Sequence, residues 1–342
     1  MRNAALIIAT ALTLSFLTTP LCFGQAWPAP KGEGAVTASC QGVVADGHYM
    51  DDGTKAPGYR TQAVNVVVET VYGITDRLTV DVLVPWVNVK YLGPEEPLNL
   101  PDNVLDDGTY HGAVSDLRFE LRYNAFSRYG VVTPFFAALI PSHSYDTLGE
   151  AAPGRDFQEY YFGAYAGRLL DPFLPRAFVQ GMYSYAIVRQ DLDIPLNHSD
   201  FGLEVGYFVT DSVPITFVWN ALWTHGGLTF EELFMAPPEV FRNLDRVVAS
   251  QFHHLGVSGS FPLSPTVSAN VEFVKFVAGV DAHYGYSISA GVSWVFKSQP
   301  VEMMPIKGRT QAEGNSPARS YLAHRALRGG REAAGARLMG GY

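Results

Sequence analysis

The last strand-like stretch of the chain shows the pattern of hydrophobic and polar positions most clearly. From Ala282 to Phe296, nearly every second position is apolar or aromatic, and the positions between them are mostly Gly or Ser. This period of two predicts a β-strand whose two faces meet different surroundings. Aromatic residues stand at both ends of the apolar face, Tyr284 and Tyr286 at one and Trp294 and Phe296 at the other. A strand that crosses a bilayer in roughly 9–11 residues has this form, because aromatic rings favour both interfaces.

The same alternation recurs along the chain, and it predicts an antiparallel, up-and-down transmembrane β-barrel of about twelve strands. An even number is expected of a single-chain bacterial barrel. The predicted strands are 34–45, 60–72, 77–90, 113–125, 131–142, 157–168, 176–189, 198–209, 213–225, 249–262, 266–278 and 283–296.

Charged residues fall on the face opposite the apolar one. In 113–125 the predicted lipid-facing side chains are Leu117, Phe119, Leu121 and Tyr123. The opposite face of that strand carries Asp116, Arg118, Glu120 and Arg122. Lys275 departs from this rule, since it shares parity with Val271 and Phe273, and we expect a bulge or a rim position there.

The connections alternate in length. Short turns rich in Gly, Asp, Ser or Pro are predicted at 73–76, 126–130, 169–175, 210–212 and 263–265. The long ones are 46–59, 91–112, 143–156 and 226–248, whereas 190–197 and 279–282 are short. Outer-membrane barrels have short periplasmic turns and longer outside loops, so both ends of the barrel are predicted to be periplasmic.

Composition divides the chain into three parts. Residues 1–26 read as a secretory signal peptide, with Arg2, the apolar run 4–17 and a small-x-small site at 24–26. Residues 27–296 form the predicted outer-membrane barrel. From Lys297 to residue 342 the alternation stops, and eight Lys/Arg against three Asp/Glu give the tail +5. We expect this tail to be mostly disordered, either an extension without a task or a basic arm for anionic lipid or an acidic partner.

Net charge and cysteine content exclude some classes of protein. The chain carries −9, so the part before residue 297 carries −14, which disfavours nucleic acid as a partner. Removal of the signal peptide leaves only Cys40, so no intramolecular disulfide is possible. No G-x-G-x-x-G, P-loop or C-x-x-C motif is present, and we predict no cofactor and no metal.

Two stretches carry a family resemblance. YGITDRLTVDVLVPWV (72–87) and DDGTYHGAVSDLRFELRYN (106–124) resemble the outer-membrane barrels grouped as phenol meta-pathway (phenol-degradation) proteins. The resemblance implies a transporter-like barrel in the bacterial outer membrane, with a loose link to phenol breakdown. The tail after Phe296 departs from the usual barrel ending, in which the last residue is commonly Phe.

The predicted interior collects the charged side chains. Besides Asp116, Arg118, Glu120 and Arg122, the candidate lumen residues are Glu69, Asp81, Glu159, Glu204 and Glu272. Such groups need partners or water, and a lumen supplies both. They could tune a solute pathway or form a salt-bridged plug that fills a closed barrel. The first hypothesis is therefore a passive channel for small organic solutes, aromatic ones by family resemblance, and not an enzyme.

Two alternatives remain open. A closed structural or adhesion barrel would present its loops to the outside. An interfacial lipid or ester hydrolase would use His254 and Ser258, which share one strand face, although no G-x-S-x-G is present. Expected partners are outer-membrane lipid and lipopolysaccharide, whereas the solute and the oligomeric state are not specified by the sequence. Solubility of exposed loops explains the acidic residues there, and divalent-cation bridging to lipopolysaccharide phosphates is an alternative that the spacing does not specify. The acidic loop residues are Asp46, Asp51, Asp52, Glu95, Glu96, Asp102, Asp106 and Asp107.

Overall fold

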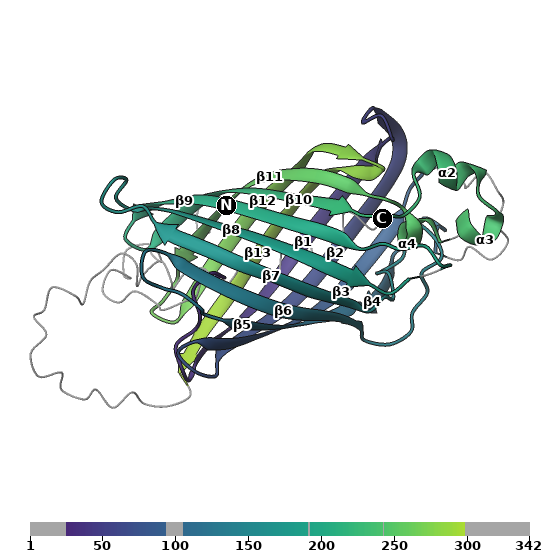
Figure 1. Cartoon of the computed structure of the whole chain (residues 1–342). Coiled ribbons are helices and arrows are strands. Elements are labelled where there is room, and N and C mark those ends of the chain that lie inside the picture. The colour runs from purple at the N-terminus through teal and green to yellow at the C-terminus, as the bar shows by residue number, and fades with distance from the viewer. Residues whose placement is uncertain (1–24, 94–104, 191, 242, 298–342) are drawn as a thin grey trace, which may run out of the picture.

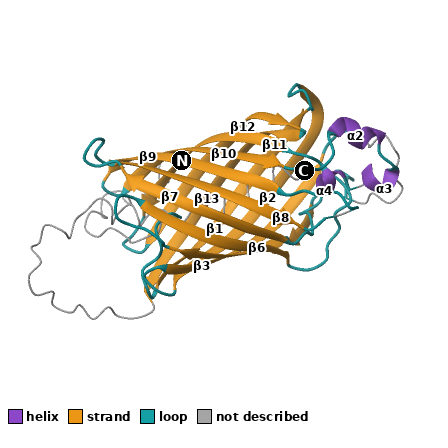
Figure 2. Ribbon diagram, in the orientation of Figure 1, coloured by secondary structure: helices purple, strands orange, loops and turns teal. Residues whose placement is uncertain are grey.

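The computed structural model is a closed antiparallel β-barrel (Figures 1 and 2). It describes residues 25–93, 105–190, 192–241 and 243–297. Apart from β4 and β5, strands that follow one another in sequence pair with each other, and the pairing of β1 with β13 closes the ring. β4 and β5 both pair with β3 and together make one stave, so the barrel has the predicted twelve.

The strands follow the predicted segments closely. Their bounds are β1 Glu33–Tyr49, β2 Lys55–Gly73, β3 Leu78–Tyr91, β4 His111–Val114, β5 Asp116–Tyr123, β6 Val131–Pro141, β7 Glu159–Leu169, β8 Ala177–Val188, β9 His198–Thr210, β10 Val213–Thr224, β11 Gln251–Pro262, β12 Val267–Val280 and β13 Ala282–Lys297.

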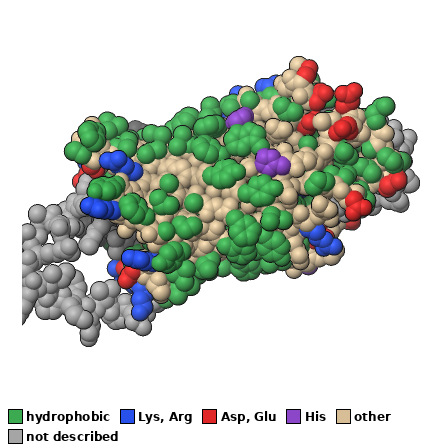
Figure 3. Space-filling view, viewed as in Figure 1, with side chains coloured by type: hydrophobic (Ala, Val, Ile, Leu, Met, Phe, Trp, Pro, Cys, Tyr) green, Lys and Arg blue, Asp and Glu red, His purple; other side chains and the backbone are tan. Residues whose placement is uncertain are grey.

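Burial alternates along each strand, as the sequence predicts. On β5, Phe119 and Leu121 face outward with about two fifths of their surface exposed, whereas Arg118, Glu120 and Arg122 are buried. The outward residues form an apolar belt around the barrel wall (Figure 3). Exposure of apolar side chains to water is unfavourable, so this belt is the surface that faces the hydrocarbon core of a membrane.

Lys275 lies on the outward face, as its parity requires. The register between β11 and β12 shifts just beyond it, where His253 pairs with Ala278 but His254 pairs with Phe276. The register shift comes after Phe276 and does not turn Lys275 inward, so the expected bulge does not take this side chain off the apolar face.

The connection predicted at 46–59 is wrong, because most of it is strand. β1 continues to Tyr49 and β2 begins at Lys55, so the turn is short. The hairpin keeps its pairing through a bulge between Ala45 and Gly47. Gly47 has φ +154°, and a Cβ there would lie 2.3 Å from the carbonyl oxygen of Ala56, so the close approach of the strands requires glycine. The Asp- and Gly-rich composition suggested a loop, but cross-strand pairing prevails.

The predicted strand 113–125 is interrupted at Ser115. β4 puts Val114 outward, and β5 puts Leu117 outward, so one extra residue lies between the two segments. Both Ser115 and Asp116 are buried as a result, and the Ser115 N–H donates to the Pro85 carbonyl oxygen at 3.0 Å.

One connection contains short helices that the sequence did not predict. Residues 226–248 include α2 Phe230–Met235, α3 Pro238–Phe241 and α4 Leu244–Val247. Thr229 and Glu232 form a capping box at the start of α2. No helix within the described residues is both long and apolar enough to cross a membrane.

The two ends of the barrel differ. One end carries the short turns β2–β3, β5–β6, β7–β8, β9–β10 and β11–β12, and the other carries the longer connections and the helices (Figure 1). Glu33 and Lys297 lie at the turn end, where the Lys297 Nζ is 2.7 Å from the Glu33 Oε1. We call these ends the turn rim and the loop rim.

The segment before β1 enters the barrel at the turn rim. Thr133 Oγ1 donates to the Ala26 carbonyl oxygen at 2.6 Å, and the Ala29 N–H donates to Thr79 Oγ1 at 3.0 Å. Trp27 packs against the inward Phe178 and Phe208. Residues 25–32, the lead-in, therefore lie across the interior between opposite walls.

Two predicted regions fall largely outside the described residues. The signal peptide assigned to 1–26 is described only at Gln25 and Ala26, both buried in the barrel. The tail assigned to 297–342 is described only at Lys297, the last residue of β13. Both assignments remain predictions.

Candidate functional site

The barrel interior is the candidate site, and it holds every charged residue proposed for it. All nine face inward and are at least nine-tenths buried: Glu69, Asp81, Asp116, Arg118, Glu120, Arg122, Glu159, Glu204 and Glu272. Strand parity explains this placement, because each lies at the alternate positions opposite the lipid-facing residues. They do not form one cluster.

Four of the nine meet in an ion-pair ladder between β3 and β5. Arg118 donates to Glu120, Arg122 donates to Asp81, and the Arg122 Nε lies 2.6 Å from the Glu120 Oε1. Asp81 pairs with Glu120 across the two strands, so the register itself brings these groups together. Two guanidinium groups and two carboxylates balance in charge, which offsets the cost of removing them from bulk water. Glu69 on β2 lies close enough to act electrostatically on Arg122.

Aromatic rings cover the ladder on the β7 side. The Arg118 guanidinium lies 5.2 Å from the Tyr161 ring centroid, and the Arg122 guanidinium lies 5.6 Å from that of Tyr165. The Tyr165 hydroxyl donates to Glu120 at 3.3 Å, and its ring stacks on Phe135 at 4.7 Å. These cation–π contacts hold the two arginines in place on the wall.

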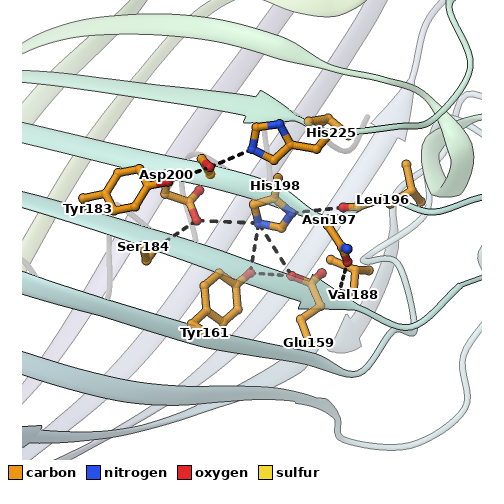
Figure 4. A network of polar contacts seen from close by, with 12 residues as sticks. Glu159, Tyr161, Tyr183, Ser184, Val188, Leu196, Asn197, His198, Asp200 and His225 are labelled. Carbon is orange, nitrogen blue, oxygen red and sulfur yellow. Dashed lines mark hydrogen bonds and ion pairs between the residues drawn. The ribbon is translucent and has the colours of Figure 1, made fainter.

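A second polar network continues from Tyr161 towards the loop rim (Figure 4). The Tyr161 hydroxyl donates to Glu159 and lies 3.3 Å from the His198 Nε2. That nitrogen is 3.9 Å from Glu159 and 3.6 Å from Asp200, and Ser184 donates to Asp200 at 3.2 Å. Polar contacts thus run from Asp81 on β3 to Asp200 on β9.

The remaining predicted residues lie apart from these networks. The Tyr145 hydroxyl, in the β6–β7 connection, donates to Asp116 at 2.5 Å. Burial and the adjacent Asp116 carboxylate raise the pKa of Tyr145. Glu204 accepts a long hydrogen bond of 3.5 Å from Gln180, and Glu272 lies on β12, far around the ring.

The opposite part of the wall carries short hydroxyl side chains. The hydroxyl wall comprises Thr37, Ser39, Ser258, Ser260, Ser268, Ser287, Ser289 and Ser293 on β1 and β11–β13. Thr37 and Ser293 lie 2.9 Å apart across the β1–β13 pair. These side chains reach only a short way into the interior, unlike the arginines and tyrosines of the charged wall on β3, β5, β7 and β9.

Apolar groups lie inside the barrel as well. One cluster joins Phe135, Tyr161, Tyr165 and Val188 on β6–β8 with Phe157 and Leu196 at the loop rim. Trp27 of the lead-in packs against it. The interior therefore offers ring faces along one wall, in addition to ions and hydroxyls.

The pair considered for hydrolysis does not form a catalytic arrangement. His254 and Ser258 share the inward face of β11, but four residues along a strand separate them by about 13 Å. The His254 ring packs against Phe252 at 4.6 Å and Phe276 at 3.9 Å between centroids. This surrounding suits a packed histidine better than a base that must reach a nucleophile.

The structure adds polar and aromatic residues that the sequence analysis did not propose: Tyr161, Tyr165, His198 and Asp200. The alternation in 157–168 and 198–209 puts them on the same inward face as Glu159 and Glu204. The sequence alone could therefore have predicted that these side chains face the interior. Their mutual contacts depend on strand register, which alternation does not specify.

One charged group of the loop rim is strongly perturbed. The His111 imidazole and the Thr109 hydroxyl lie 2.9 Å and 2.7 Å from the Asp107 Oδ1. The hydrogen bond from His111 contributes most to lowering the pKa of Asp107 to about 2. Asp107 therefore keeps its negative charge at any physiological pH.

No family model matches the sequence, and no curated protein matches it. The fold is similar to the COG4313 outer membrane channel from Pseudomonas putida F1, at 14% identity and a TM-score of 0.63, covering 80% of this chain and 98% of that one. The NanC porin is a more distant structure, at 10% identity and a TM-score of 0.45, covering 75% of this chain and 98% of that one.

The chain is a twelve-stranded outer-membrane β-barrel. Closure of the ring, the apolar outward belt and the similarity in fold agree on this point. A closed ring leaves no unpaired sheet edge, which a hydrocarbon layer would not tolerate. The protein accordingly belongs in the bacterial outer membrane.

Proposed function

We propose that the protein is a channel through which small organic solutes, aromatic ones among them, cross the outer membrane by passive diffusion. The proposal rests on the difference between the charged wall and the hydroxyl wall of the barrel interior. Long, paired side chains occupy the charged wall, whereas many inward positions of β1 and β11–β13 are short Ser and Thr, with longer side chains such as Asn270, Glu272 and Phe276 among them. The proposed path for a solute therefore runs beside the hydroxyl wall, where the side chains are shortest.

The chemistry of the interior favours solutes that combine a ring with a polar group. The Phe135 and Tyr165 rings stack on each other beside Arg122, so aromatic and charged groups lie together on this wall. Aromatic side chains bind flat apolar solutes by stacking, while polar groups fix their orientation. The resemblance to phenol meta-pathway barrels, and the similarity in fold to a protein described as an outer membrane channel, support the same reading.

Conductance of the purified full-length protein in planar bilayers tests the proposal. A channel conducts, and Asp116→Asn, Arg118→Gln and Glu120→Gln shift its ion selectivity, because these groups border the path. Phe119→Leu, on the lipid-facing side of the same strand, is the control that leaves selectivity unchanged. A closed structural barrel gives no conductance, and the ladder variants then lower only its stability. Strict non-conductance would overturn the proposal.

We also propose lipopolysaccharide as a partner of the loop rim. Acidic side chains gather at this end of the molecule (Figure 3), among them the half-exposed Asp46 and Asp107. Divalent cations could then bridge these carboxylates to lipid phosphates. Co-purification of lipopolysaccharide that is lost with EDTA, and lost equally in Asp46→Asn/Asp107→Asn, supports the bridge. Retention in EDTA contradicts it.

A further inference from the structure

Two histidines and a glutamate meet at the loop rim, away from the ion-pair ladder. His48 on β1, His283 on β13 and Glu150 in the β6–β7 connection are all buried. The His48 Nε2 lies 3.9 Å from the Glu150 Oε1, and the His283 Nε2 lies 3.8 Å from the Glu150 Oε2. The two imidazole centroids are 4.3 Å apart. The three side chains can each offer one ligand atom, and these atoms lie within 4.8 Å of one another.

Strand pairing places the two histidines. His48 and His283 are register partners in the β1–β13 pair, and both side chains face inward. The bulge between Ala45 and Gly47 shifts the parity of β1 just before His48. Without this shift, His48 would lie on the lipid-facing side of β1, with the other even-numbered residues of that strand.

The glutamate comes from across the ring. β6 and β7 are separated from β1 by β2, β3 and β5, so the connection that carries Glu150 spans the mouth to reach this pair. Its turn is fixed locally: the Ala152 N–H donates to the Gly149 carbonyl oxygen, and Gly149 has φ +130°. The Asp106 carboxylate accepts hydrogen bonds from the Glu150 and Ala151 N–H groups.

We propose that His48, His283 and Glu150 bind a divalent transition-metal ion of the Zn²⁺ class. Two imidazoles and one carboxylate are a common protein ligand set for zinc, with a further position left for water. Zinc–ligand distances of about 2.0–2.2 Å put two ligands of a tetrahedral ion about 3.4 Å apart. The two imidazole–carboxylate spacings of 3.9 and 3.8 Å are slightly wider, so a side-chain adjustment would close the site.

Charge and burial agree with a cation here. Glu150 is buried against two imidazoles, and a carboxylate in such a place is costly unless positive charge accompanies it. The His283 Nδ1 has no hydrogen-bond partner among the described residues. Borderline-soft imidazole nitrogens favour Zn²⁺, Ni²⁺ and Cu²⁺ over Mg²⁺ and Ca²⁺.

The ion would join the β6–β7 connection to the opposite wall. Glu150 is the only one of the three ligands that lies outside the strands, so binding would hold this connection across the loop rim. The inference concerns the metal site itself and does not depend on whether the interior conducts.

Binding of Zn²⁺ and Co²⁺ to the full-length protein in detergent tests the proposal. We expect one ion per chain by calorimetry, and Co²⁺ absorption bands typical of tetrahedral nitrogen and oxygen ligands. His283→Ala and Glu150→Gln should each weaken binding at least about 10–100-fold, since even outer partners of metal ligands have that effect. His225→Ala removes a histidine of the same rim and should leave the affinity unchanged.

Heat-modifiable migration of each variant shows that the barrel is intact. Protection of the β6–β7 connection from protease by Zn²⁺, reversed by EDTA and absent in Glu150→Gln, would show that the ion holds this connection. Failure of the wild type to bind, or equal binding by the wild type, His283→Ala and Glu150→Gln, overturns the proposal. In the latter case the ion occupies exposed groups such as Asp107 and His111.

Discussion

The charged wall and the hydroxyl wall share one barrel and one alternation, yet they are built differently inside. Arg122 on β5 reaches Asp81 on the next strand and Glu120 on its own strand, and Tyr165 on β7 covers it. On the hydroxyl wall, Thr37 and Ser293 contact only across their own strand pair. The comparison teaches that ion pairs and cation–π contacts link the strands of the charged wall, whereas the hydroxyl wall relies mainly on backbone pairing between its strands. We therefore expect bulky substitutions on the hydroxyl wall to affect conductance, and charge-removing substitutions on the charged wall to affect stability.

The largest effect is expected from adding a bulky side chain to the hydroxyl wall. Ser289→Trp introduces a side chain of about 150–250 Å² into the interior, and we expect it to abolish most of the conductance in planar bilayers. The matched control is Ile288→Trp on the same strand, whose side chain faces lipid with 57% of its surface exposed. Equal conductance of both variants would mean that solutes do not pass along this wall.

The next effect concerns the ladder. Glu120→Gln leaves Arg118 and Arg122 without their shared carboxylate, so we expect a loss of about 3–5 kcal/mol in the free energy of unfolding. Guanidinium unfolding in detergent micelles measures this loss. Ser289→Ala on the other wall removes one neutral hydroxyl and should cost only about 1 kcal/mol. If the two changes cost the same, the walls do not differ in the way described.

A smaller effect is expected where the lead-in joins the walls. Trp27 is partly buried against Phe178 and Phe208, and Trp27→Ala should cost about 2 kcal/mol, below the value for a fully buried Trp. The same unfolding experiment applies, with Lys31→Ala at an exposed position as its control. An unchanged stability would show that the lead-in adds nothing to the barrel.

The smallest effect is expected at the loop rim, which belongs to neither wall, and it concerns the pH dependence of stability. Asp281, in the turn between β12 and β13, accepts a hydrogen bond from the Phe230 N–H, and burial raises its pKa. The folded state therefore favours the protonated form of Asp281. The contribution of this group to the free energy of unfolding is fully present below the ordinary Asp pKa, and it is lost as pH rises through the raised pKa. Asp281→Asn keeps the acceptor without the charge.

We accordingly expect Asp281→Asn to gain stability relative to the wild type as pH rises from 3.5 to 7. Asp107→Asn serves for contrast, because the pKa of Asp107 is lowered to about 2 in the folded state, so this variant should lose stability relative to the wild type as pH rises through the ordinary Asp pKa. A wild-type advantage over Asp281→Asn that grows with pH would contradict the assignment for Asp281.

The sequence predicted the fold in considerable detail because lipid on one side and a polar interior on the other impose a strict alternation. Leu117, Phe119 and Leu121 could be assigned outward, and Arg118 and Glu120 inward, from parity alone. The prediction of a long connection at 46–59 was wrong, although its Asp- and Gly-rich composition is typical of a turn. Backbone pairing with β13 and between β1 and β2 extends β1 and β2 into this segment.

The site was predictable only in part. Parity places Glu120 and Asp81 in the interior, but the register of β3 against β5 decides that they meet. His48, Glu150 and His283 lie far apart along the sequence, and a bulge and a mouth-spanning connection bring them together. The short helices of 226–248 depend on packing of Phe230 and Leu233 against Val247 and Val248, which no periodicity in so short a segment reveals.

The unequal extent of strand pairing has a consequence for sideways opening of the wall. β1 pairs with β13 from Glu33 to Tyr49, so the junction of the first and last strands is extensively bonded. β5 pairs with β6 only from Asp116 to Arg122, and β6 contains Pro134, which has no N–H to donate. If a solute ever left the lumen laterally into the membrane, the strands expected to separate are therefore β5 and β6, beside the ladder, and not the two ends of the chain.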